Sequence, residues 1–140
     1  MKTNLILIAL AALCGMISLS AQEADIALIV NKAIAVDKIS SQDVRDIFTA
    51  KKRSWDDSTA VKIVIQSKNL PSFFEKFLGM SDSSFKKLWL KLTLEGKAKA
   101  PTDLTSDTEV LKYVAENAGA IGYVKAAALT DAVKRVAVTE

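Results

Sequence analysis

One stretch of the sequence, SDTEVLKYVAENAGAIGYV at residues 106–124, constrains the fold more than any other. Ser106 and Glu109 have the S-x-x-E spacing of a capping box, in which two side chains satisfy backbone N–H groups at a helix start. Apolar residues then recur at helical spacing, and Gly119 suits the left-handed position that ends a helix. Residues 120–124 form a short apolar run, typical of a strand covered on both faces. A helix that leads directly into a buried strand predicts half of an α/β unit.

Three other apolar runs predict strands. They are residues 25–30 (DIALIV), residues 61–66 (VKIVIQ), and residues 133–138 (VKRVAV), which we expect to be exposed on one face. Helices are predicted after Ser40, at residues 70–78, and after Ser81 or Asp82, with a helical turn at residues 126–129. This alternation favours an α/β fold with an open mixed sheet and helices packed on its faces.

The first 21 residues predict a secretory signal peptide. Lys2 supplies a positive start, residues 5–17 are almost wholly apolar, and small residues follow at Ser18, Ser20 and Ala21. The apolar run is shorter than the roughly 20 residues that a membrane-spanning helix needs, although an uncleaved anchor is the alternative. Cleavage after Ser20 or after Ala21 fits the pattern. We therefore expect a signal peptide at residues 1–21 and one periplasmic domain at residues 22–140.

The composition argues against catalysis and against nucleic-acid binding. Cys14 is the only cysteine and leaves with the signal peptide, and the chain has no histidine. Without these residues a thiol nucleophile, the commonest general base and the commonest metal ligand are missing, so we expect no enzyme, no cofactor and no metal. Loss of Lys2 lowers the net charge from +3 to +2, which does not indicate a nucleic-acid partner. The acidic pairs Asp56-Asp57 and Asp103/Asp107 are expected to serve in turns and caps.

Several segments together resemble the small phosphate-binding-protein-like family, related to the substrate-binding component of phosphate ABC transporters. They are DIALIVNK, ISSQDVRDIFTAKKRSW, FFEKFLGMSDSSFKKLWLKLTLEGKAKAP and LKYVAENAGAIGYV. The resemblance covers residues 25 to about 138. It implies a single periplasmic-binding-protein-like lobe, with phosphate or another oxyanion as ligand and a link to phosphate ABC transport.

The resemblance also implies where an anion would bind. The family's anion loop, with a Ser-Gly-Thr signature at a helix start, falls at residues 67–72 (SKNLPS), and the signature is not intact. Pro71 has no N–H group to donate, and no glycine lets the backbone come close to an anion. The alternative is a capped helix, with Asn69 as the cap. The candidate anion-binding residues are Asn31, Ser67, Lys68, Asn69 and Ser72.

Two basic regions have a simpler interpretation as solvated surface. Lys51, Lys52 and Arg53 lie beside Trp55, which we expect in the core, and a contact patch for an anion or a membrane-bound partner is the alternative. Lysines also surround the helix after Ser81.

The alternative to oxyanion binding is an envelope protein-interaction module on a solute-binding lobe that has lost its anion site. Its partner would be a membrane transporter or another envelope protein.

Overall fold

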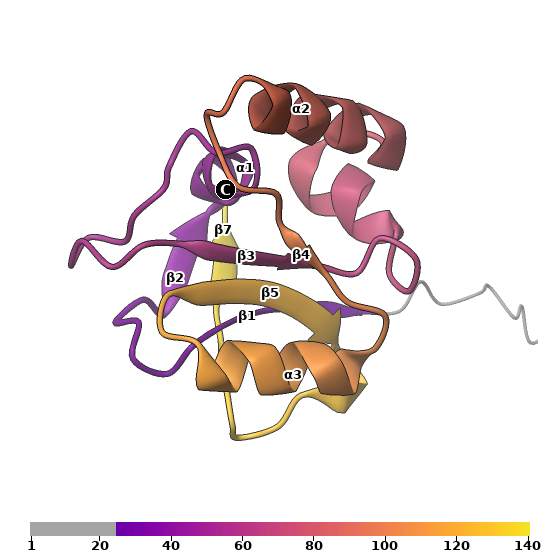
Figure 1. Cartoon of the computed structure of the whole chain (residues 1–140). Helices are drawn as coiled ribbons and strands as arrows, with labels where there is room; N and C mark the ends of the chain where they lie inside the picture. Colours follow the sequence, from indigo (N-terminus) through magenta and orange to yellow (C-terminus); the bar gives the residue numbers. More distant parts are fainter. Residues whose placement is uncertain (1–24) are drawn as a thin grey trace, which may run out of the picture.

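The computed structural model describes residues 25–140, so the predicted signal peptide lies outside the described residues. Its main sheet has five strands in the order β4-β3-β5-β1-β6 (Figure 1). β1 runs antiparallel to β5 and β6, whereas β3 runs parallel to β5 and β4. The bounds are β1 Ile26–Val30, β3 Lys62–Ile65, β4 Thr102–Asp103, β5 Ala120–Lys125 and β6 Lys134–Arg135. The three strands that the sequence predicts most clearly therefore share one sheet.

Helices cover both faces of this sheet, as the sequence predicts. Along β1, Leu28 faces one apolar cluster and Ile29 faces the other, because successive side chains of a strand point to opposite faces. One face carries α1 (Ser41–Phe48), the π-helical turn η1 (Phe74–Leu78) and α2 (Asp82–Leu94), and the other carries α3 (Asp107–Glu116) (Figure 1). No helix among residues 25–140 has the length and apolar character needed to cross a membrane.

Serine caps start the three α-helices at the predicted places. Ser40, Ser81 and Ser106 each accept a hydrogen bond from the backbone N–H three residues later. The reciprocal half of the capping box at α3 differs from the prediction. The carboxylate of Glu109 accepts from the Thr105 N–H at 3.1 Å, one residue before the cap.

The helix predicted at residues 70–78 begins two residues later than expected. Helical residues run from Ser72 to Leu78, the last five as η1 (Phe74–Leu78), and Gly79 ends the helix with a φ of 65°. The Leu70 N–H donates to the carbonyl of Gln66, so the first residues form a turn. Pro71 then interrupts the backbone hydrogen bonds, because it has no N–H.

The single strand predicted at residues 133–138 is wrong, because two short strands stand in its place. β6 pairs with β1, and β7 (Ala137–Thr139) pairs in parallel with β2 (Lys38–Ser40) in a separate sheet. The chain passes from one sheet to the other at the buried residue Val136. The Val136 N–H donates to the Leu28 carbonyl, and the Ala137 N–H donates to the Asp37 carbonyl. The predicted turn at residues 126–129 is present as the 3-10 helix η2 (Ala126–Ala128).

Candidate functional site

The structure does not bring all the predicted anion-binding residues together. Val30 of β1 lies opposite Ile121, which also neighbours Ile63 of β3. Because β1 is antiparallel to β3 and β5, Asn31 lies at the end of the sheet where those two strands begin. Ser67 follows β3 and lies at the opposite end.

Asn31 has a structural role at its end of the sheet. Its Nδ2 donates to the carbonyls of Val114 at 2.8 Å and Ala115 at 3.2 Å, near the end of α3. Its Oδ1 accepts from the Ala33 N–H at 2.9 Å. The side chain is buried and its donors and acceptor are engaged, so Asn31 ties β1 to α3.

The hydrogen-bond donors of Ser67 are occupied by a carboxylate of the same chain. The Ser67 N–H donates to Asp103 Oδ1 at 3.1 Å, and the Ser67 hydroxyl donates to Asp103 Oδ2. Asn69 donates from Nδ2 to Gln66 Oε1 at 2.7 Å, and no side chain caps η1. The expectation that Asn69 caps a helix is therefore wrong. Lys68 and Ser72 are exposed.

A buried polar network supports this end of the sheet. The Tyr123 hydroxyl accepts from the Gln66 N–H at 2.8 Å, and Gln66 Nε2 donates to the Tyr123 carbonyl and to Asp107. Burial raises the pKa of Tyr123 above its ordinary value. The Tyr123 ring stacks on Phe73, with 3.7 Å between ring centroids and 9° between planes. Phe73 and Tyr123 are both fully buried and belong to the core.

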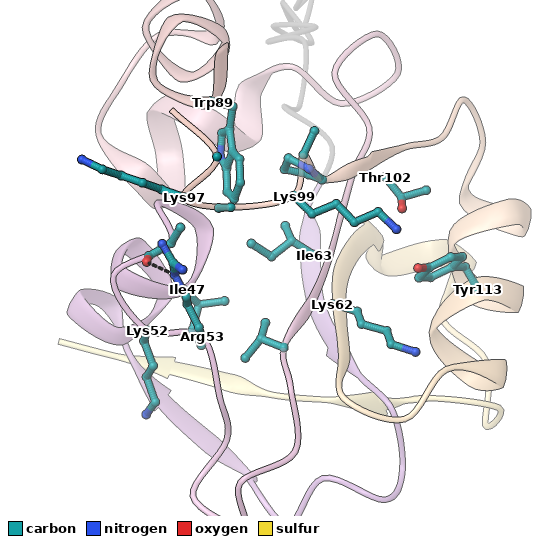
Figure 2. Close-up of a pocket in the computed structure, with 16 residues that line it drawn as sticks. Ile47, Lys52, Arg53, Lys62, Ile63, Trp89, Lys97, Lys99, Thr102 and Tyr113 are labelled. Carbon is teal, nitrogen blue, oxygen red and sulfur yellow. Dashed lines mark hydrogen bonds between the residues drawn. The ribbon is translucent and has the colours of Figure 1, made fainter. Parts of the chain in front are cut away.

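A pocket of about 650 Å³ opens at the other end of β3, and its lining includes Lys52 and Arg53 of the basic loop that the sequence offered as an alternative anion contact. It forms because β4 pairs only with Val64 and Ile65, so Lys62 and Ile63 have no strand neighbour on that side. The loop after α2 and the C-terminal end of α1 complete the wall (Figure 2). Five of its lining residues are basic: Lys52, Arg53, Lys62, Lys97 and Lys99.

Close packing joins the segment before β3 to the turn before β5. The buried Trp55 donates from Nε1 to the Gly119 carbonyl at 2.9 Å, which confirms that this tryptophan belongs to the core. Gly119 has a φ of 81°, and a Cβ there would lie 2.1 Å from the Ala60 carbonyl oxygen. Only glycine fits this position, where the chain turns from α3 into β5.

No acidic residue lines the pocket, and only two of its cations have acidic partners nearby. Lys52 lies 3.7 Å from Asp43 and 3.8 Å from Asp56, and Lys97 lies 2.9 Å from Glu95. Arg53 donates to the Ala50 carbonyl at 3.1 Å (dashed in Figure 2), and Lys62 donates to Asn117 at 3.5 Å. Within residues 25–140, Arg53, Lys62 and Lys99 form no ion pair. The pocket is therefore positively charged.

The pair Asp56-Asp57 lies in a turn, as expected, whereas Asp103 and Asp107 bind residues that are distant in the sequence. The Thr59 N–H donates to Asp57 Oδ1 at 2.9 Å, and this hydrogen bond lowers the pKa of Asp57. Asp103 and Asp107 bind Ser67 and Gln66 as described above. In the part of the chain that the structure describes, no three carboxylates gather as a hard-cation site would require.

The sequence matches a family model described as the PBP superfamily domain over residues 12–139. The chain belongs to this family. No curated protein matches the chain.

Solved structures similar to this chain include three whose names refer to phosphate binding or phosphate transport. An ABC-type phosphate transport receptor from Vibrio cholerae shares 17% identity, with a TM-score of 0.64 over 81% of this chain and 46% of its own. A putative phosphate ABC transporter substrate-binding protein with bound phosphate from Clostridium perfringens shares 20% identity, with a TM-score of 0.61 over 81% and 44%. A possible phosphate binding protein from Planctomyces limnophilus shares 13%, with a TM-score of 0.61 over 83% and 42%. The likeness shows the binding-protein fold, and this chain spans less than half the length of these proteins.

Proposed function

We propose that this protein is a solute-binding-type lobe that binds a small oxyanion such as phosphate in its basic pocket and is linked to phosphate ABC transport. One observation carries the proposal: Arg53, Lys62 and Lys99 surround a pocket with no acidic lining residue, and they form no ion pair within residues 25–140. The names of the similar solved structures, which refer to phosphate binding and transport, support the choice of ligand.

The pocket can hold an anion by charge-assisted hydrogen bonds. Lysine and arginine donors bind phosphate or sulfate oxygens about twice as strongly as neutral donors do. The apolar wall beside them, which includes Ile63 and Trp89, lowers the local dielectric constant and strengthens the attraction. Binding requires no reacting side chain, so the proposed role is not enzymatic.

The predicted signal peptide would place this lobe in the periplasm, where it would meet solutes before they cross the inner membrane. A membrane transporter or another envelope protein would then be its partner.

The loop at residues 67–72 is a second, weaker anion position within the proposal. Lys68 and Ser72 are exposed there and can approach an anion from solvent. Ser67 would first have to release Asp103, and Asn69 would have to release Gln66. We therefore expect the basic pocket to bind more tightly than the loop, and Asn31 to take no part.

Thermal unfolding with added phosphate or sulfate tests the proposal. A ligand that binds only the folded state stabilises it, by about 2.7 kcal/mol at a concentration 100 times its dissociation constant. We expect millimolar phosphate to raise the Tm of the wild type and to have a much smaller effect on the Lys62→Gln/Lys99→Gln variant. Lys87→Gln, an exposed lysine on α2 outside this pocket, is the matched control. A wild type that no anion stabilises would contradict the proposal.

A second candidate function is an envelope protein-interaction module that has lost the anion site of its relatives. The occupied donors of Ser67 favour it, and so do two leucines on the outer side of α2, Leu90 at 61% exposed and Leu94 at 78% exposed. Light scattering after size exclusion and a pull-down from envelope extract test this candidate. A strict monomer that retains no partner would count against it.

A further inference from the structure

The basic pocket is much larger than an inorganic oxyanion. Its volume of about 650 Å³ has room for about 20 water molecules at roughly 30 Å³ each, whereas phosphate or sulfate has only five non-hydrogen atoms. Pockets of this volume are typical of organic ligands that bury most of their surface. A bare oxyanion would therefore leave most of the pocket to water.

The lining divides into two basic flanks with an apolar floor between them. Figure 2 shows Arg53 on one side and Lys62 and Lys99, near Tyr113, on the other. Ile63 lies between these two flanks. Charge on both flanks favours negative groups at two ends of a ligand, and the floor favours an apolar body between them.

We propose that the pocket takes a small organic dianion, with an apolar body and a negative group at each end, in preference to an inorganic oxyanion. This inference rests on the proposed function, because it assigns the class of anion to the same pocket. Arg53 would bind one end of the ligand, and Lys62 with Lys99 would bind the other.

A matched series of sulfonates tests the inference by isothermal titration calorimetry. Naphthalene-2,6-disulfonate carries a negative group at each end of a flat apolar ring system, naphthalene-2-sulfonate lacks one of them, and sulfate lacks the rings. We expect the disulfonate to bind about tenfold more tightly than either of the others, since it makes one more charged hydrogen-bonded contact than the monosulfonate.

Variants on each flank show whether both ends are used. Arg53→Gln should reduce affinity for the disulfonate to that of the monosulfonate, and Lys62→Gln/Lys99→Gln should do the same from the other flank. Lys87→Gln should bind like the wild type, and circular dichroism should show that all variants are folded.

The outcomes separate this inference from the proposed function. If phosphate and sulfate bind and the disulfonate binds no more tightly, the inference is overturned and the proposed function stands. If the disulfonate binds with the expected variant pattern and phosphate does not, the inference stands and the phosphate assignment is overturned. A disulfonate whose affinity neither flank variant changes also overturns the inference.

Discussion

Both ends of β3 carry polar side chains, and the two ends differ in whether those side chains bind a carboxylate of the same chain. After the strand, Ser67 donates twice to Asp103, and Gln66 bonds with Asn69, Tyr123 and Asp107. At the other end, Arg53 precedes the strand and Lys62 is its first residue. Neither has a carboxylate partner among the described residues. We call these regions the closed end and the open end of β3.

This difference shows that the type of residue is a weaker guide to a binding site than its unused donors. At the closed end, Asp103 supplies the negative charge that an external anion would bring, so a ligand there has to compete with the chain itself. At the open end, a ligand of Lys62 and Lys99 competes with no carboxylate and with one long hydrogen bond, 3.5 Å from Lys62 to the side-chain oxygen of Asn117. The sequence resemblance directed attention to the closed end because a family signature would fall there.

The largest expected effect follows from the core packing at the closed end. Phe73 is fully buried, stacks on Tyr123 and lies 4.9 Å from Phe48 between ring centroids. Phe73→Ala should lower the free energy of unfolding by about 3–5 kcal/mol, because it removes apolar contacts and leaves a cavity. Urea unfolding measures this, with the half-buried Phe77→Ala as the milder control. Equal losses of unfolding free energy in the two variants would show that packing around Phe73 does not stabilise the closed end more than packing around Phe77.

A smaller effect on stability is expected when the carboxylate of Asp103 is removed. Asp103→Ala leaves the buried Ser67 N–H and hydroxyl without their acceptor. The loss should be about 1 kcal/mol, since Asp103 is exposed and water can take its place. Asp131→Ala, at an exposed carboxylate in the loop before β6, should cost less.

The same variant also tests whether the closed end is unable to bind an anion or is only blocked by Asp103. If Asp103→Ala gains phosphate binding, and that binding is lost again in Asp103→Ala/Ser67→Ala, the closed end is a competent anion site that the carboxylate blocks. If no binding appears, the loop geometry itself does not suit an anion.

Much of the fold could be predicted from the sequence, and most of the pocket could not. Capping serines, apolar periodicity and Gly119 depend on local chemistry, so they located the three α-helices and the three central strands. β2 and β4 have three and two residues, too few to show a pattern. The pocket depends on where β4 stops pairing with β3, and its cations come from separate segments around residues 52–53, 62 and 97–99. No spacing within a single segment marks such a site.

The last test of the closed end concerns how the buried Tyr123 hydroxyl makes stability depend on pH. Burial raises the pKa of Tyr123 in the folded protein, so the unfolded chain loses this proton first, near pH 10. Its contribution to stability is therefore complete below about pH 10 and is lost as the pH rises further. The wild type should lose more Tm between pH 8 and pH 11 than Tyr123→Phe, which cannot ionise there. Tyr113→Phe, at the open end, should retain the wild-type loss, because its Tyr123 is intact. An equal loss in Tyr123→Phe and the wild type would mean that the hydroxyl at the closed end is reached by water, and the contrast between the two ends would then be weaker than the hydrogen bonds indicate.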